Sequence, residues 1–412
     1  MSQPTQPLSM CVARSEWCGM PGRSRDEFVQ TLAFALFLLV LAPFSCSQDG
    51  VTPASHSAPT GTAKKIILFI GDGMGFEQVK AAGMYEGGAG GTLSFEAFPY
   101  RGSTKPLNAE GGVTDSAASA TAMATGNKVS NGVISMSIPG NGNPLVTVLE
   151  LLKAEGKSTG LVTTTFVTHA TAAAFGAHEP DRNNYSNIAV DYLYDARPNV
   201  LFGGARYITK PAAAAAGYTV VADRAGLQAL DTETESMVSG QFGGDHMPYE
   251  LDGLGGLPHL SEMTLAALHI LDNDPDGFFL MVEGGRIDHA CHANDIERTI
   301  RETIEFSRAV AKAVEWGRNR SEILIIVTAD HETGGLQVLA NNGMGIVPTV
   351  TWGTTGHTTS EIPVYGWGAG AASISGSMEN TDIFRILMQS SALPSVAFSF
   401  LSMRSPASFH SP

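Results

Sequence analysis

Residues 65–70 read KIILFI, and Gly71 follows them. A short, apolar and β-branched run of this kind is typical of a strand that is buried on both faces of a parallel sheet. Comparable runs occur at residues 158–164 (STGLVTT), 277–282 (GFFLMV), 322–328 (EILIIVT) and 362–367 (IPVYGW). The sequence therefore predicts a set of buried strands spread over most of the chain.

Helical patterns separate these runs. Residues 145–154, 260–271 and 294–316 carry apolar side chains at helical spacing, and in the last segment these are Ile300, Ile304, Phe306, Val310 and Val314. Strands that alternate with helices predict an α/β fold, in which a mostly parallel central sheet is sandwiched between helices as a three-layer αβα structure. In such folds ligands collect at the carboxyl ends of the strands.

The composition supports one large folded unit. The chain has 412 residues, of which 43% are hydrophobic and 16% charged, and no long linker interrupts its middle. We expect one domain over residues 64–394, a flexible tether before it at residues 48–63 and a C-terminal tail at residues 395–412. The net charge of -15 argues against a nucleic-acid surface, because such a surface needs a basic footprint.

The N-terminus has the features of a signal peptide, which we place at residues 1–47. An apolar run at residues 31–44 follows Arg23 and Arg25 and is shorter than the ~20 residues of a membrane span. The run ends beside Cys46 in a segment that resembles a lipoprotein cleavage site, and ordinary secretion with cleavage nearby is the alternative. We therefore expect an exported protein, periplasmic or at the cell surface. If the segment is cleaved as in a lipoprotein, lipid is attached to Cys46.

Three of the predicted strands are followed by an acidic residue beside glycines. These acids are Asp72, Glu283 and Asp330. Taken singly, such a residue more often caps a helix or turns a loop. On one parallel sheet, however, the three carboxylates would converge at the same edge, and their mutual repulsion is costly unless cations lie between them.

The stretch EGGRIDHACHAND, residues 283–295, adds further metal-ligand types to this edge. Asp288 and His292 are four residues apart, so they share one face if Asp288 opens a helix that continues through Asn294; this is the spacing by which helices hold zinc. Glu283 would reach a different ion, and Cys291 is assigned to packing. The alternative is a solvated polar turn before a helix.

A nucleophile candidate lies in the stretch GVTDSAASATA, residues 112–122. Asp115 is placed to cap a helix of small residues, which puts Ser116 at the amino end of that helix, beside unpaired N–H groups that attract anions. A bound zinc ion can lower the pKa of such a hydroxyl and make it a nucleophile. Read alone, the same stretch is an Ala/Ser-rich core helix with a cap.

Taken together, the motifs resemble those of the alkaline phosphatase family. GDGMG (71–75), TDSAASATA (114–122), THATAAAFGAH (168–178), EGGRIDHACH (283–292) and TADHETGG (328–335) occur in the family's order and extend over most of residues 64–370. The resemblance implies a metal-dependent hydrolase of phosphate monoesters. It also implies two zinc ions, a third site usually filled by magnesium, and a serine that is transiently phosphorylated.

The resemblance also implies a role for each matching residue. It assigns the first zinc to Asp72, Asp330, His331 and Ser116, the second zinc to Asp288, His292 and His357, and the third ion to Asp72, Glu283 and Thr171. Arg182, in the segment DRNNYSN, matches the arginine that clamps phosphate, because its planar fork suits two phosphate oxygens. Asp115, His169 and His289 would lie just outside these ligands.

Two positions depart from the pattern of some family members. His169 stands where these members have aspartate, and His289 stands where they have lysine, so the identity of the third ion is open. The connection 335–355 lacks a long insertion that some relatives carry, so no added dimer or lid element is expected there. A homodimer is an open expectation. The alternatives to a phosphomonoesterase are a phosphodiesterase or sulfatase of the wider superfamily and a non-catalytic member that binds metal and phosphate.

Overall fold

The computed structural model describes residues 61–391. The predicted signal peptide, Cys46, almost all of the predicted tether and the C-terminal tail lie outside this range. Within it, no helix is both long enough and apolar enough to cross a membrane.

A ten-stranded sheet forms the centre of the described part, with the strand order β14-β2-β13-β8-β1-β7-β3-β4-β6-β5. Strand β13 runs antiparallel to β2 and β8, and the other neighbours in the sheet are parallel. The strands of this sheet are β1 (Lys65–Gly71), β2 (Tyr100–Lys105), β3 (Ser158–Phe166), β4 (Val200–Gly204), β5 (Thr219–Val221), β6 (Val238–Gln241), β7 (Phe278–Glu283), β8 (Ile323–Ala329), β13 (Ile362–Gly368) and β14 (Gly376–Glu379). All five predicted strands are present, and the mostly parallel sheet is confirmed.

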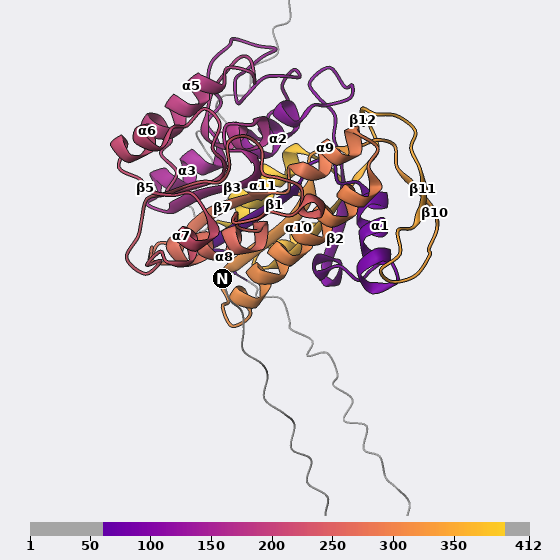
Figure 1. The fold of residues 1–412 in the computed structure, drawn as a ribbon. Coiled ribbons are helices and arrows are strands. Elements are labelled where there is room, and N and C mark those ends of the chain that lie inside the picture. The colour runs from indigo at the N-terminus through magenta and orange to yellow at the C-terminus, as the bar shows by residue number, and fades with distance from the viewer. Residues whose placement is uncertain (1–60, 392–412) are drawn as a thin grey trace, which may run out of the picture. The chain divides into compact units, whose positions relative to one another are not determined.

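Helices cover both faces of the sheet, which confirms the predicted three-layer arrangement (Figure 1). The α-helices are α1 (Phe76–Gly87), α2 (Ser116–Thr125), α3 (Val148–Ala154), α4 (Ala170–Gly176), α5 (Tyr185–Val190), α6 (Lys210–Ala215), α7 (Arg224–Gln228), α8 (Leu260–Leu271), α9 (Arg286–His292), α10 (Ile296–Gly317) and α11 (Thr381–Ser390). Helices α2, α3, α4 and α11 pack in one hydrophobic cluster, and α1, α8 and α10 pack in another.

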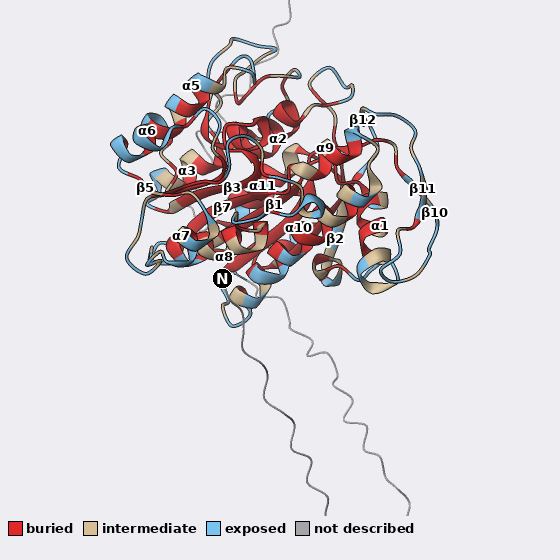
Figure 2. Ribbon diagram, viewed as in Figure 1, coloured by how far each residue is buried: buried red, intermediate tan, exposed pale blue. Residues whose placement is uncertain are grey.

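Strand β1 shows why the sheet needs a layer on each face. Ile66, Leu68 and Ile70 belong to the first cluster, whereas Ile67 and Phe69 belong to the second, and all five are fully buried. Side chains alternate between the two faces of a strand, so an apolar run without polar residues must be covered on both sides. Figure 2 shows the resulting buried band through the centre of the fold.

A helix that begins at Asp288 and continues through Asn294 is not present, whereas the predicted helix over residues 294–316 is confirmed as α10. Helix α9 begins at Arg286 and ends at His292, and α10 starts only at Ile296. Asn294 separates them, because it has a left-handed backbone with φ 52°, which a continuous right-handed helix does not allow. Asp288 and His292 nevertheless share one face of α9, since they lie four residues apart within this helix.

Two small antiparallel sheets lie outside the central one. Strands β10 (Gln337–Ala340) and β11 (Thr349–Thr351) form one of them. Strands β9 (Glu332–Thr333) and β12 (His357–Thr358) form the other, in which His357 pairs with Thr333. Because β9 follows β8 almost directly, this pairing brings His357 back to the carboxyl end of β8.

Candidate active site

The three acids that follow predicted strands lie together at one edge of the sheet. Strands β8, β1 and β7 are parallel neighbours, and in their register Ile70 is opposite both Glu283 and Thr328. Asp72 follows β1, Glu283 ends β7, and Asp330 follows β8. All three acids are fully buried, as expected from the alignment of parallel strand ends.

Several oxygens of these acids have no hydrogen-bond partner within the described protein. They are both carboxylate oxygens of Asp72, Oδ2 of Asp330 and Oε1 of Glu283. Burial raises the pKa of Asp72 well above its usual value, and repulsion from Asp330 raises it further. Burial also raises the pKa of Glu283 to about 7. Buried, unpaired carboxylates are what divalent cations bind, so the donor set fits metal ions.

The first cluster consists of Asp72, Asp330 and His331, whose ligand atoms lie within 4.8 Å of one another. His331 is fully buried, and its Nε2 lies 3.2 Å from Asp330 Oδ2 and 3.6 Å from Asp72 Oδ1. The Oγ atom of Ser116 lies 3.4 Å from the same nitrogen. The four residues that the family resemblance assigns to one zinc are thus brought together.

The second cluster consists of Asp288, His331 and His357. His292 adjoins it, because its Nε2 lies 3.2 Å from Asp288 Oδ2 and 3.1 Å from His357 Nε2. The hydrogen bond to Asp288 raises the pKa of His292 to about 9. Although burial works the other way, the hydrogen bond from His292 and the neighbouring imidazoles hold the pKa of Asp288 below its usual value.

The third cluster consists of Asp72, Glu283 and His169. His169 is expected just outside the ligands, but its ring atoms lie among them, and its Nδ1 is buried without a hydrogen-bond partner. The hydroxyl of Thr171 is likewise buried and without a partner. The ring of His289 lies 5.7 Å from that of His169, as a neighbour of the cluster. The geometry therefore makes His169 a further candidate ligand of this cluster.

Ser116 is the first residue of helix α2, and Asp115 is its N-cap. The side chain of Asp115 accepts hydrogen bonds from the backbone N–H of Ala118 (3.0 Å) and from Nη1 of Arg182 (2.9 Å). The predicted cap is confirmed, and the same carboxylate holds the arginine beside the serine. A helix N-terminus and a guanidinium at one place form a site for an anion with two or more oxygens.

Two positioning residues make contacts that the sequence did not reveal. Gly73 has φ 72°, and a Cβ there would lie 2.9 Å from Asp288 Cα, so only glycine lets these two segments approach. Glu332 is buried and accepts hydrogen bonds from Gln78 (2.8 Å) and from Thr358 (2.5 Å), the residue after His357. Its place directly after Asp330 and His331 is the sequence signal that could have identified it.

Comparisons with known proteins agree with this geometry. The family profile described as alkaline phosphatase matches residues 63–205 and 201–350. Alkaline phosphatase 3 of Bacillus subtilis is 36% identical over 296 residues, and the match covers 68% of this chain but only 63% of that protein's length. The alkaline phosphatase of Escherichia coli is 32% identical over 400 residues, which cover 78% of this chain and 84% of that enzyme.

A solved structure shares the fold. The alkaline phosphatase of the Antarctic bacterium TAB5 superposes with a TM-score of 0.72 at 28% identity, over 81% of this chain and 99% of that one. The matched residues include all three clusters except His357 of the second cluster, which lies beyond the range of the profile match. This chain belongs to the alkaline phosphatase family.

Proposed function

We propose that this protein is a metal-dependent hydrolase of phosphate monoesters that acts through a phosphorylated Ser116. One observation carries the proposal most directly: the Ser116 hydroxyl lies 3.4 Å from His331, within a group of buried carboxylates that lack partners. The similarity of the chain to the alkaline phosphatases of Bacillus subtilis and Escherichia coli also supports hydrolysis of phosphate monoesters.

The chain's own residues supply the binding of the phosphoryl group. Arg182 would hold two of its oxygens with a planar pair of N–H donors, and the N-terminus of α2 would attract a third. Asp115 keeps the guanidinium in place, because its Oδ2 lies 2.9 Å from Arg182 Nη1. Charge on the equatorial oxygens grows toward the transition state, so fixed donors there lower the barrier.

Ser116 would attack phosphorus and displace the alcohol, and water would then cleave the phosphoserine and release inorganic phosphate. The first and second clusters would hold two zinc ions, which favour the ionised serine and stabilise the departing oxygen. Asp72, Asp330 and His331 serve the first ion with Ser116, and Asp288, His292 and His357 serve the second. These nitrogen and oxygen donors suit zinc.

The third cluster differs in the donors that it offers. Thr171, Glu283 and Asp72 are oxygen donors, which suit magnesium, whereas His169 adds an imidazole, which suits zinc and similar ions. A variant of the TAB5 enzyme in which a histidine is replaced by aspartate was solved with magnesium in its third site. We infer that His169 shifts this chain's third site away from magnesium, and that His169→Asp restores magnesium binding, as metal analysis after dialysis would detect.

Export and lipid attachment at Cys46 remain proposals that rest on the N-terminal sequence. Growth of expressing cells with radioactive palmitate tests them. Label on the native chain and none on a Cys46→Ala variant supports a lipid anchor. An unlabelled chain that is recovered from outside the cytoplasm supports ordinary secretion without a lipid anchor.

The central experiment compares three substrates with one aryl group: a phosphate monoester, a phosphate diester and a sulfate. Each is assayed after chelation and again after zinc and magnesium are restored. We expect metal-dependent turnover with a strong preference for the monoester, lost in Ser116→Ala and retained in Ser377→Ala, an exposed serine on the edge strand β14. Equal turnover of the diester or sulfate would favour those reactions of the superfamily, and full activity of Ser116→Ala would refute the nucleophile.

A further inference from the structure

The edge of the sheet that carries the ion clusters continues with a different set of side chains. Beyond β7 the next strands are β3, β4 and β6, all parallel to it. Phe166 ends β3, Tyr207 lies in the loop after β4, and His246 follows β6. The same edge is therefore acidic at β8, β1 and β7 and aromatic at β3, β4 and β6.

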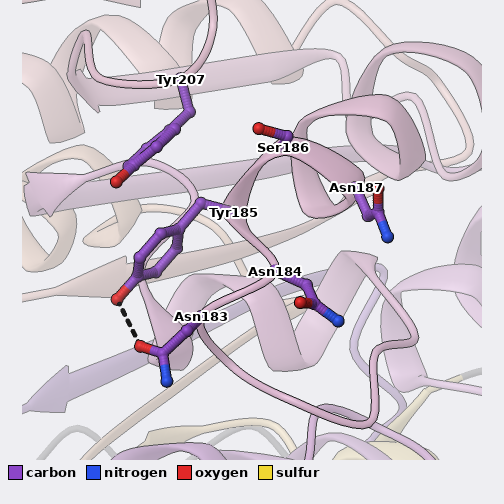
Figure 3. Close-up of a pocket in the computed structure, with 6 residues that line it drawn as sticks. All are labelled: Asn183, Asn184, Tyr185, Ser186, Asn187 and Tyr207. Carbon is purple, nitrogen blue, oxygen red and sulfur yellow. Dashed lines mark hydrogen bonds between the residues drawn. The ribbon is translucent and has the colours of Figure 1, made fainter.

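A pocket with a volume of about 370 Å³ opens beside these aromatic residues. Asn183, Asn184, Tyr185, Ser186, Asn187 and Tyr207 line it (Figure 3). The rings of Tyr185 and Tyr207 are stacked, with centroids 4.7 Å apart and planes at 28°. The hydroxyl of Tyr185 donates to Asn183 Oδ1 at 3.0 Å, which fixes the ring. The pocket thus offers rigid aromatic surface with amide groups at its border.

Close contacts connect this pocket to the phosphate-binding residues. Its first lining residue directly follows Arg182 in the chain. The ring of Phe166 lies 5.1 Å from that of Tyr185 and 5.2 Å from that of His169. His169 in turn lies 3.5 Å from Arg182 Nη2. The pocket therefore borders the residues proposed to hold the phosphoryl group.

The backbone of Tyr207 gives independent support. Tyr207 has φ 71°, which is unfavourable for a bulky side chain, and the residue is still 38% exposed. Residues held in such conformations cluster at ligand-binding sites. The guanidinium of Arg206 lies 5.0 Å from the Tyr207 ring and pairs with Asp245, so neighbouring groups hold the ring in its exposed position.

We propose that this pocket binds the alcohol part of the substrate and favours phosphate monoesters whose alcohol carries a planar aromatic ring, such as a nucleoside. The ring would pack against the aromatic pair of Tyr185 and Tyr207, of which Tyr207 is the more exposed. This inference rests on the proposed function of the adjoining site and adds a substrate class to it.

The test uses adenosine 5′-monophosphate and ribose 5-phosphate, which release the same type of primary alcohol and differ by the base. The ratio of their kcat/KM values is measured on the full chain with zinc and magnesium restored. We expect a ratio of about ten or more in favour of the nucleotide, since stacking of one base on an aromatic side chain typically contributes such a factor. Tyr207→Asn and Tyr185→Leu should each bring the ratio to about one; asparagine is chosen because it tolerates a positive φ.

A matched control and a second readout separate the outcomes. Tyr194→Leu replaces an exposed tyrosine outside the pocket and should keep the native ratio. A native ratio near one, or a ratio that both pocket variants leave unchanged, overturns the inference while monoester turnover itself stands. Calorimetry measures adenosine binding to the Ser116→Ala variant without any turnover. Binding that is lost when Tyr207→Asn is added supports the pocket even if no monoester is hydrolysed. Absence of adenosine binding overturns the inference.

Discussion

Replacing Glu283 by glutamine should have opposite effects on stability with and without metal ions. Glu283 is fully buried in the third cluster, and its Oε1 has no hydrogen-bond partner, whereas its Oε2 accepts from Thr163 at 2.6 Å. Glutamine has nearly the same shape and can keep that acceptor. The substitution therefore removes a charge with little change in packing.

The size of the effect follows from the pKa. Burial raises the pKa of Glu283 from 4.5 to about 7, so ionising it costs about 3 kcal/mol more in the metal-free folded protein than in the unfolded chain. A raised carboxyl pKa contributes stability that is fully present below pH 4.5 and is lost as the pH rises through 7. At pH 8.5 the metal-free native protein bears this cost, and Glu283→Gln does not.

Thermal and urea unfolding at pH 5.0 and pH 8.5 measure the effect, with EDTA or with zinc and magnesium. Without ions at pH 8.5, Glu283→Gln should be more stable than the native protein by about 2–3 kcal/mol, and the difference should shrink at pH 5.0. With ions the order should reverse, because the amide binds a cation less well than a carboxylate does.

Two results would refute this reasoning. The first is a metal-free native protein that is at least as stable as Glu283→Gln at pH 8.5, which would mean that the carboxylate is not strained by burial. The second is an unchanged order of stability after ions are added, which would mean that Glu283 does not contact a cation.

Three further predictions concern the surroundings of the site. Asp115→Asn should keep the cap of α2 but weaken the hold on Arg182, lowering kcat/KM for a monoester by about tenfold and the free energy of unfolding by less than about 1 kcal/mol. Glu302→Gln should stabilise the protein by on the order of 2–4 kcal/mol at pH 9.5 and hardly at pH 4.5 in urea unfolding, since burial raises the pKa of Glu302 to about 8. Gly204→Ala should cost more than about 3 kcal/mol in the same assay, because a Cβ there would lie 1.7 Å from the backbone oxygen of Asp245.

Each of these predictions has an outcome that contradicts it. For Asp115→Asn, the contradicting outcome is a kcat/KM equal to that of the native protein, together with equally strong inhibition by phosphate. For Glu302→Gln it is a stability difference that does not grow with pH. For Gly204→Ala, the control is Gly244→Ala, where the added Cβ meets no atom within 4 Å, and equal stability of the two variants would contradict the steric argument.

The central strands could be predicted because their sequences leave few alternatives. Strand β1 is apolar at every position from Ile66 to Ile70, and only burial on both faces suits such a run. Five strands of the sheet were missed, namely β2, β4, β5, β6 and β14. Most residues of β2 and β14 are exposed or half-buried, and β4, β5 and β6 are only three to five residues long. The stop at Asn294 was missed because a left-handed residue of this kind has no strong signal in one sequence.

Part of the candidate site could also be predicted from the sequence, and part could not. The meeting of Asp72, Glu283 and Asp330 follows from the alignment of parallel strand ends, so the sequence could predict it. The closeness of His169 to Asp72 and Glu283 depends on where α4 starts after β3, and no spacing rule gives that position. The stacking of Tyr185 on Tyr207 depends on the pairing of β3 with β4, which the sequence did not reveal.

The three clusters share members: Asp72 belongs to the first and third, and His331 to the first and second. Ions that share a ligand cannot fill their sites independently, because each one reorients and neutralises a group that its neighbour also uses. If ions fill these clusters as proposed, the amount of one ion bound at equilibrium should depend on the concentration of the other, and binding should depart from a sum of independent sites. The metal content of the protein would then be a joint property of all three clusters, set by the mixture of ions available to the folded protein.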